Sequence, residues 1–323
     1  MTAPNGSSSD TTRPVRTPTL DDIGSAWQTV HSVLEPTPLV SSPFAPDGFL
    51  KLETFQPTGA FKVRGGLSAV SALPLDQRAV TASAGNHGLG IAWASARLGR
   101  QATVVVPEHS SAAKVEALRT YPIELVEHGA DYEAAEKHAL ELAAAEGASY
   151  ISAYNDPNVI AGQATIGCEL DSQAPGELTV VVPVGGGGLL SGLALWARPR
   201  PGVRLAGVES SESRGISAAV AAGHIVRVPV GDTIADGLAG NLEPGSVTVG
   251  LVAGAQLVAV DDEELRAAMR WLFTHHGLVT EASGAAGVAA VLGGKIDVAG
   301  RLVVVVTGRN IAAASFAMVL QGG

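Results

Sequence analysis

The sequence predicts an α/β fold in which parallel-rich sheets are flanked by helices. From residue 80 onward, short runs of β-branched residues alternate with alanine-rich stretches of helical length, which is typical of βαβ units. The valine runs at 180–182 and 303–306 are almost uninterrupted, as expected of strands buried on both faces. A chain of 323 residues is also longer than one ordinary core requires, so we expect two domains.

Taken in order, the predicted strands alternate with the predicted helices. The strands are placed at Gly48–Glu53, Ala79–Ser83, Ala102–Val106, Ile123–Glu127, Tyr150–Ala153, Leu178–Val182, Leu205–Val208, Gln256–Val260 and Leu302–Val306. The helices are placed at residues 87–98, 111–119, 131–146, 158–172, 189–197, 213–222, 261–275 and 282–292. The helix over 261–275 has clear end signals, because Asp261 or Asp262 is a good N-cap and Gly277 a good stop.

Composition excludes several classes of protein. A net charge of −10 and only 4% aromatic residues argue against nucleic-acid binding, which needs a basic surface and bases to stack on. Residues 1–20 are rich in Ser, Thr and Pro and lack the apolar core of a signal peptide, so we expect a disordered N-terminal arm. The most apolar window, residues 178–197, contains Pro183 and four consecutive glycines, so no membrane span is expected. The single cysteine, Cys168, rules out an intramolecular disulfide and fits a reducing cytoplasm.

One lysine stands in an unusual setting. The stretch 57–66, PTGAFKVRGG, places Lys62 between glycines just after the strand-like run 48–53. A desolvated lysine can serve as an amine nucleophile, and lowering its pKa from about 10.4 to near 7 takes about 4–5 kcal/mol. The alternative is a solvated lysine at the start of a helix.

Two glycine-rich turns accompany it. Residues 185–188 are four glycines between a predicted strand and a helix that begins near Leu189, which predicts a cradle of backbone N–H groups for a phosphate. The turn 83–88, SAGNHG, could receive a carboxylate in the same way. A dinucleotide site is the competing interpretation of the first turn, with Glu209 as the ribose ligand. Ser191 then stands in place of the third glycine, and the Lys62 and Asn86 turns would have no purpose.

Together the three segments resemble the pyridoxal-phosphate enzymes of fold type II, which are similar to the tryptophan synthase β chain, and specifically the serine/threonine dehydratase (threonine ammonia-lyase) and serine racemase branch. The resemblance runs from about Glu35 to the C-terminal end. It implies pyridoxal 5′-phosphate as cofactor and a small α/β domain inserted into a larger one. We place the small domain at residues 76–149 and the large, cofactor-binding domain at 21–75 and 150–323. The active site would then lie in the cleft between them.

The resemblance also implies a role for each site residue. Lys62 would carry the cofactor and act as general base. Asn86 would bond the phenolic oxygen of the cofactor. The Thr307 hydroxyl would bond the pyridine nitrogen, leaving the ring largely unprotonated and favouring elimination over transamination. The implied cofactor-binding residues are Phe61, Lys62, Asn86, Gly185, Gly186, Gly187, Gly188, Leu189 and Thr307. The implied substrate-binding residues are Ser83, Ala84, Gly85, Asn86, His87 and Gly237.

The chain departs from the family pattern at two places. Arg309 stands where the family usually has glycine, and it could contact a second carboxylate of the substrate or be a surface residue. Glu209 aligns with an acidic ligand of the divalent-metal site of the racemase branch, but Gly215 stands where a second acidic ligand is expected. We therefore predict no metal site and keep Glu209 as the one candidate ligand. The pair His275–His276 is interpreted as a helix end.

These observations predict a lyase that converts L-threonine, L-serine or a related β-hydroxy amino acid to a 2-oxo acid and ammonia by α,β-elimination. The alternatives are a serine racemase, a β-replacement enzyme, a 3-hydroxyaspartate or hydroxyectoine-pathway dehydratase, and a cofactor-binding sensor without turnover. Racemisation needs a second acid/base on the far face of the cofactor, and the family racemases place a serine where this chain has Ala84. We expect a small amino acid as the substrate, a homodimer and a cytoplasmic location.

Overall fold

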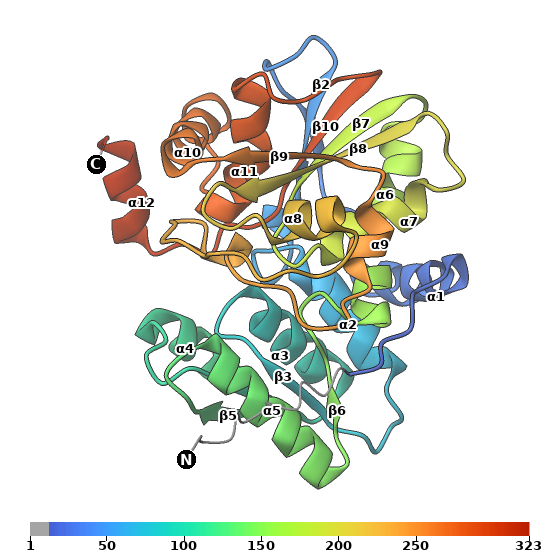
Figure 1. Cartoon of the computed structure of the whole chain (residues 1–323), viewed down its shortest axis with the longest axis vertical. Helices are drawn as coiled ribbons and strands as arrows, with labels where there is room; N and C mark the ends of the chain where they lie inside the picture. Colours follow the sequence, from blue (N-terminus) through green and yellow to red (C-terminus); the bar gives the residue numbers. More distant parts are fainter. Residues whose placement is uncertain (1–12, 323) are drawn as a thin grey trace, which may run out of the picture.

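The computed structural model describes residues 13–322, and it contains two sheets with helices on both faces (Figure 1). The strands are β1 (Leu39–Ser41), β2 (Gly48–Leu52), β3 (Ala79–Ala82), β4 (Ala102–Val106), β5 (Glu124–Glu127), β6 (Ser149–Tyr150), β7 (Leu178–Pro183), β8 (Val203–Ser210), β9 (Gln256–Val260) and β10 (Arg301–Val306). The helices are α1 (Leu20–His31), α2 (Lys62–Ala72), α3 (Asn86–Leu98), α4 (Ala112–Arg119), α5 (Tyr132–Glu146), α6 (Pro157–Gln173), α7 (Gly188–Ala197), α8 (Gly215–Ala222), α9 (Thr248–Val252), α10 (Asp262–His276), α11 (Ala282–Leu292) and α12 (Ala313–Leu320), with 3-10 turns at Glu53–Phe55 and Asp236–Leu238.

The larger sheet has six strands in the order β1-β2-β10-β7-β8-β9. All neighbours are parallel except the edge pair β1 and β2. Helices α10, α11 and α12 contribute to the core on one face, and α1, α6, α7, α8 and α9 to the core on the other. This burial on both faces explains the valine runs of β7 and β10, because neither face of these strands meets water.

The smaller sheet has four parallel strands in the order β5-β4-β3-β6, all between residues 79 and 150. Helix α5 covers one face, and α2, α3 and α4 pack on the other. The predicted α/β class with parallel-rich sheets is therefore confirmed. Within the described residues, no helix is both long and apolar enough to cross a membrane.

The predicted elements are present with shifted ends, and several further ones were missed. Helix α10 begins after Asp261, which forms a capping box with Glu264, and it ends at Gly277 in the left-handed conformation (φ 64°). The strand predicted at 150–153 ends at Tyr150, and residues 151–155 form an irregular segment after it. Helices α1, α2, α9 and α12 and strand β1 were not predicted.

The arm differs from its prediction where it is described. Residues 1–12 lie outside the described residues. In residues 13–20, Arg13 Nη2 donates to the backbone oxygen of Asn155 at 2.6 Å, and the Thr19 side chain caps α1 in a capping box with Asp22. Disorder is therefore the wrong description of residues 13–20, because a helix cap and a long-range hydrogen bond hold them.

Helix α2 lies between two neighbouring helices at backbone distance. A Cβ atom on Gly66 would lie 2.6 Å from the backbone oxygen of Gly90 in α3. A Cβ on Gly162 in α6 would lie 2.6 Å from the backbone oxygen of Arg64 in α2. Both contacts allow glycine alone, so these residues bring the helix that starts at Lys62 against α3 and α6.

Candidate active site

The predicted site segments follow the carboxyl ends of strands in both sheets. The Lys62 turn follows β2, Thr307 follows β10 and the glycine run follows β7, while the Ser83–His87 turn follows β3 of the small sheet. Parallel strands place their carboxyl ends at one edge of a sheet, which is where ligands bind in α/β folds. Hydrogen bonds join three of these segments between the two sheets: the Phe61 N–H donates to the Thr307 oxygen, and Asn310, three residues after Thr307, donates to the backbone oxygen of Thr58 and to Asn86 Oδ1. The glycine run meets the Lys62 side chain through the segment after β6, where Tyr154 lies against Gly186 and Ala153 accepts from Lys62.

Lys62 is the first residue of α2, and its side chain is half-buried. Nζ donates a hydrogen bond to the backbone oxygen of Ala153 at 2.8 Å and lies 5.3 Å from the centroid of the Phe61 ring. Burial lowers the pKa of Lys62 from 10.5 to about 8. A sizeable fraction of the amine is thus neutral near neutral pH, as a nucleophile or general base requires.

The turn before Lys62 is bound to the end of β10. The Phe61 N–H donates to the backbone oxygen of Thr307 at 2.9 Å, and Ala60 forms an isolated β-bridge with Gly308. Thr307 is buried. The hydroxyl predicted to meet the ring nitrogen and the amine predicted to carry the cofactor therefore belong to adjacent, hydrogen-bonded backbone segments.

The glycine run forms a tight turn that leaves no room for side chains. A Cβ on Gly185 would lie 2.9 Å from the backbone oxygen of Gly237, and one on Gly186 would overlap the ring of Tyr154. Gly187 has a φ of 85°, a conformation that favours glycine. Gly188 and Leu189 open helix α7, so their N–H groups lie at the positive end of the helix dipole.

The Ser83–His87 turn leads into α3. The Gly85 N–H donates to the Ser83 hydroxyl at 3.1 Å, and Ala84 packs on the core between α3 and α4. Asn86 is held on both sides, because its Nδ2 donates to Glu281 Oε1 at 2.7 Å and its Oδ1 accepts from Asn310 Nδ2 at 2.6 Å. The amide predicted to meet the cofactor thus has a fixed orientation.

His87 is buried and neutral. Its Nε2 lies 3.2 Å from the backbone oxygen of Ile151, to which it donates. Burial and the nearby Lys62 charge lower the pKa of His87 to about 3. The imidazole therefore adds no positive charge to the site.

Glu281 and Gly237 close the side of the site that belongs to the large sheet. The Gly237 N–H donates to the Ser283 hydroxyl at 3.2 Å, two residues from Glu281. Burial raises the pKa of Glu281 from 4.5 to about 7, partly offset by the hydrogen bond from Asn86. This carboxyl group therefore changes charge near neutral pH.

Sequence reasoning missed the segment that follows β6. The backbone oxygen of Ala153 accepts from Lys62, and the Tyr154 ring lies against Gly186 while its hydroxyl accepts from the Glu243 N–H at 2.6 Å. The available signal was a tyrosine, in a chain that has only four, two residues before the Asp156 cap of a helix that begins with proline.

Arg309, which departs from the family pattern, and Glu209, the candidate metal ligand, have defined places. The exposed Arg309 donates its N–H to the backbone oxygen of Gly59 at 2.9 Å, and its side chain lies over that glycine at the rim of the Lys62 turn. Glu209 accepts hydrogen bonds from the N–H groups of Ile216 and Ser217 at the start of α8. No cluster of three or more candidate metal ligands occurs in residues 13–322.

The residues present fit pyridoxal phosphate. The glycine run offers a phosphate cradle whose tightness excludes side chains, and the half-buried Lys62 amine has a lowered pKa. Asn86 and Thr307 carry an amide and a hydroxyl, which are the kinds of partner that the phenolic oxygen and the ring nitrogen of the cofactor would require.

Comparisons with known proteins agree with this chemistry. The family model described as "Pyridoxal-phosphate dependent enzyme" matches residues 30–308. The L-threonine ammonia-lyase of Thermotoga maritima is 37% identical over 305 residues, covering 91% of this chain and 76% of that protein. The structure of maize serine racemase superposes with a TM-score of 0.87 and 30% sequence identity, covering 95% of this chain and 98% of that one. The processed form of threonine deaminase isoform 2 from Solanum lycopersicum superposes with a TM-score of 0.87 and 29% identity, covering 99% of each chain. The chain therefore belongs to the family of pyridoxal-phosphate dependent enzymes.

Proposed function

We propose that the chain is an ammonia-lyase that converts L-threonine, L-serine or a related β-hydroxy amino acid to a 2-oxo acid and ammonia. The observation that carries the proposal is the half-buried Lys62 amine, with a pKa lowered to about 8, next to the end of β10 and to α3. The similarity to L-threonine ammonia-lyase over 91% of the chain supports this reaction class.

Each site residue has one task in this proposal. Pyridoxal phosphate, when bound, supplies a ring that withdraws electrons from the substrate's α-carbon and makes its proton acidic. The N–H groups of residues 185–189 hold the phosphate, and those of residues 83–87 hold the substrate carboxylate. The Lys62 amine removes the α-proton, the bond from the β-carbon to oxygen breaks, and the leaving hydroxide takes up one proton to depart as water, so that the α-proton and the hydroxide lost together amount to one water molecule. Hydrolysis of the released product then gives the 2-oxo acid and ammonia.

A substrate screen tests the proposal. The protein with added pyridoxal phosphate is incubated with L-serine, L-threonine, D-serine and threo-3-hydroxyaspartate, and the 2-oxo acid and ammonia are measured. We expect turnover of at least one L-β-hydroxy amino acid, and its loss in Lys62→Ala. Cofactor binding without turnover of any of them would instead favour the sensor, and full turnover by Lys62→Ala would refute the role of this lysine.

A serine racemase is the second candidate, because maize serine racemase superposes over 95% of the chain. Racemisation needs an acid/base group on the face of the cofactor opposite the lysine, and Ala84 has no proton to exchange. We therefore expect L-serine to give 2-oxo acid in excess of D-serine. Chiral analysis of the same incubations separates the two activities, and added sulfide would reveal β-replacement.

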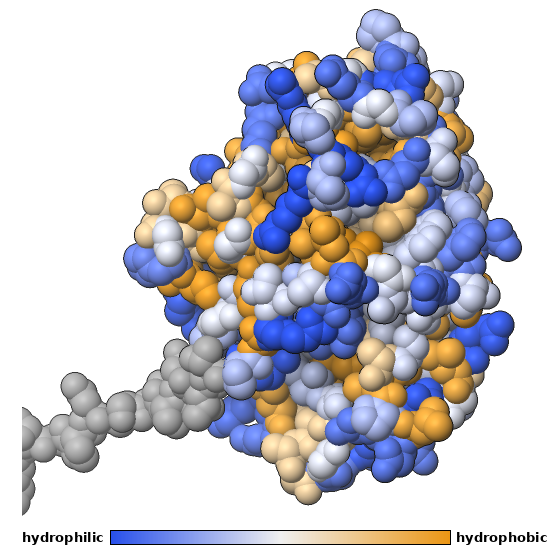
Figure 2. All heavy atoms as spheres, turned by 90° about the vertical axis from the view of Figure 1, so that its right-hand side faces the viewer, coloured by the Kyte–Doolittle hydropathy of each residue, from blue (hydrophilic) through white to orange (hydrophobic). Residues whose placement is uncertain are grey.

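We also propose that the protein acts in the cytoplasm as a homodimer. The face at the right of Figure 1, shown directly in Figure 2, carries broad apolar areas between hydrophilic ones. Contiguous apolar surface of this kind is typical of an interface. Sedimentation of the cofactor-bound protein would measure the oligomeric state, and a monomer would refute this part.

A further inference from the structure

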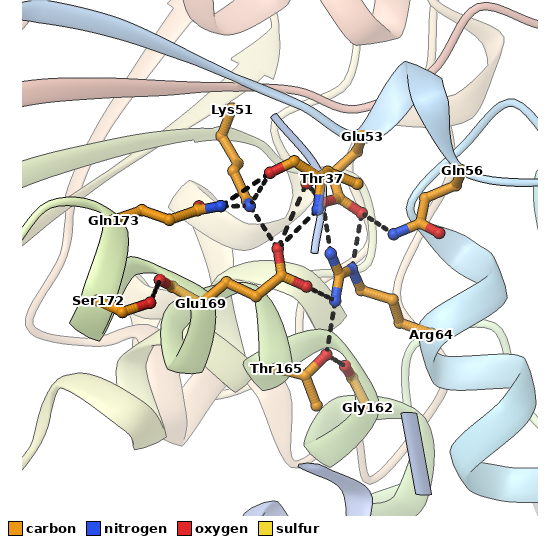
Figure 3. A network of polar contacts seen from close by, with 10 residues as sticks. All are labelled: Thr37, Lys51, Glu53, Gln56, Arg64, Gly162, Thr165, Glu169, Ser172 and Gln173. Carbon is orange, nitrogen blue, oxygen red and sulfur yellow. Dashed lines mark hydrogen bonds and ion pairs between the residues drawn. The ribbon is translucent and has the colours of Figure 1, made fainter. Parts of the chain in front are cut away.

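A network of buried charged side chains lies beside the Lys62 turn (Figure 3). It joins Lys51 at the end of β2, Glu53 directly after it, Arg64 in α2 and Glu169 in α6. We call these four residues the buried network. Their side chains are 0–3% exposed, so water reaches none of the four charges.

Arg64 is bound on two sides. Its Nε and Nη2 donate to the two carboxylate oxygens of Glu53 at 2.7 and 2.8 Å, in the paired geometry that suits a guanidinium group. On the other side, Nη1 lies 2.6 Å from Glu169 Oε1 and donates to Thr165 Oγ1 at 3.1 Å. Two carboxylates and a hydroxyl thus fix the plane of the guanidinium group.

Lys51 completes the network. Its amine donates to the Glu169 carboxylate, to the backbone oxygen of Thr37 at 2.7 Å and to Gln173 Oε1 at 2.6 Å, which uses all three of its protons. Two positive and two negative charges give no net charge. Burial opposes ionisation of Glu53, but the charge and hydrogen bonds of Arg64, the Lys51 charge and the Thr37 hydrogen bond together outweigh it and lower the pKa of Glu53 below its ordinary value.

Stability alone is a weak explanation for such a network. Removing four charges from water is costly, and well-packed apolar side chains often serve equally well. What charged groups add is directional bonding, which permits one arrangement of the attached backbones. The attached backbones here are the two that hold Lys62.

Arg64 lies two residues after Lys62, in the first turn of α2. Its partners Thr165 and Glu169 lie on α6, the helix that begins just after Ala153, whose backbone oxygen accepts from Lys62 Nζ. Gly162 lies so close to the backbone of Arg64 that α2 and α6 are in direct backbone contact there. The buried network therefore connects both partners of the Lys62–Ala153 hydrogen bond.

We propose that Arg64 is a positioning residue for Lys62: held by Glu53 and Glu169, it fixes the first turn of α2 against α6, so that the lysine amine stays in its half-buried position beside Ala153. The inference rests on the proposed role of Lys62. The network itself does not touch the substrate.

The test is the pH dependence of Lys62 reactivity in the full-length chain freed of cofactor. A limiting amount of an amine-acylating reagent is added between about pH 6.5 and about pH 10.5, and modification of the Lys62 peptide is measured by mass spectrometry. The wild-type midpoint should lie near 8. His87, with a pKa of about 3, stays neutral throughout. Glu281, with a pKa of about 7, titrates in the range, so the series is repeated in a Glu281→Gln background.

Arg64→Lys keeps the charge but loses the paired hydrogen bonds to Glu53. Because a loosened first turn admits water to the amine, we expect the Lys62 midpoint to rise by about one pH unit, which is about a tenfold loss of reactivity below pH 8. Glu169→Gln keeps the shape of the side chain and should also raise the Lys62 midpoint. If Arg64→Lys fails to fold, the midpoint in Glu169→Gln tests the inference. The matched control is Lys295→Met, which removes an ion pair to Glu264 (2.6 Å) outside the site and should leave the midpoint unchanged.

The two ideas fail in different ways. If Arg64→Lys and Glu169→Gln lower the melting temperature but leave the Lys62 midpoint unchanged, the network is structural only and the inference is overturned. If borohydride reduction of the cofactor-bound wild type labels a lysine other than Lys62, the proposed function fails instead.

Discussion

Replacing Gly186 by alanine tests the phosphate cradle at its tightest point. The new Cβ would lie within 2.5 Å of Cδ2 of the Tyr154 ring, whereas carbon atoms in contact stay about 3.5–4.0 Å apart. The ring cannot turn away freely, because its hydroxyl accepts a 2.6 Å hydrogen bond from the Glu243 N–H. The glycine run must therefore shift by about 1 Å.

A shift of that size removes about one N–H bond to the phosphate, worth about 1.5–3 kcal/mol. We expect the dissociation constant for pyridoxal phosphate to rise by about 10- to 100-fold. The assay is a titration of the cofactor-free protein with pyridoxal phosphate, in which binding is measured by the quenching of tryptophan fluorescence. Gly250→Ala in α9 is the matched control, because its Cβ would meet no atom within 4 Å. Unchanged cofactor affinity in Gly186→Ala would refute the assignment of this turn.

Three further predictions concern single residues. Burial raises the pKa of Glu281 to about 7, so the contribution of this group to stability is lost as the pH rises from about 4.5 through 7. In urea unfolding without cofactor, the free energy of unfolding of Glu281→Gln should exceed that of wild type by an amount that grows between pH 5 and pH 8 towards about 3 kcal/mol. A difference in the free energy of unfolding that does not depend on pH would contradict this. Cys168 is half-buried, and burial raises the pKa of its thiol to about 11, so a disulfide reagent at pH 8 should label it more slowly in the folded protein than in the urea-unfolded chain; equal labelling rates would contradict the raised pKa. Ala84→Ser restores a hydroxyl at the racemase position and should raise D-serine formation from L-serine above wild type; chiral chromatography that detects no increase would count against our use of this position.

Much of the fold could be predicted, because its strongest signals are local. The valine-rich strands β7 and β10 and the capping box of α10 depend on residues adjacent in the chain. Helix α2 was missed for the opposite reason. Gly65 and Gly66 are poor helix formers, and they are tolerated because the backbones of α3 and α6 approach there, which is a tertiary fact.

The candidate site divides in the same way. The glycine run and the Lys62 turn stand out as contiguous motifs, and the structure brings them together with the Asn86 turn. The buried network did not stand out, because Lys51, Glu53, Arg64 and Glu169 are single charges spread over more than one hundred residues of sequence. Only the arrangement of β2, α2 and α6 makes them neighbours.

The most direct test of the central claim is the identity of the lysine that carries the cofactor. The chain has five lysines, at positions 51, 62, 114, 137 and 295. Borohydride reduction of the protein with pyridoxal phosphate, followed by proteolysis and mass spectrometry, should find the cofactor attached to Lys62 and absent from the Lys62→Ala protein. Attachment to any of the other four lysines, or an unmodified Lys62 in a protein that turns over substrate, would contradict the account.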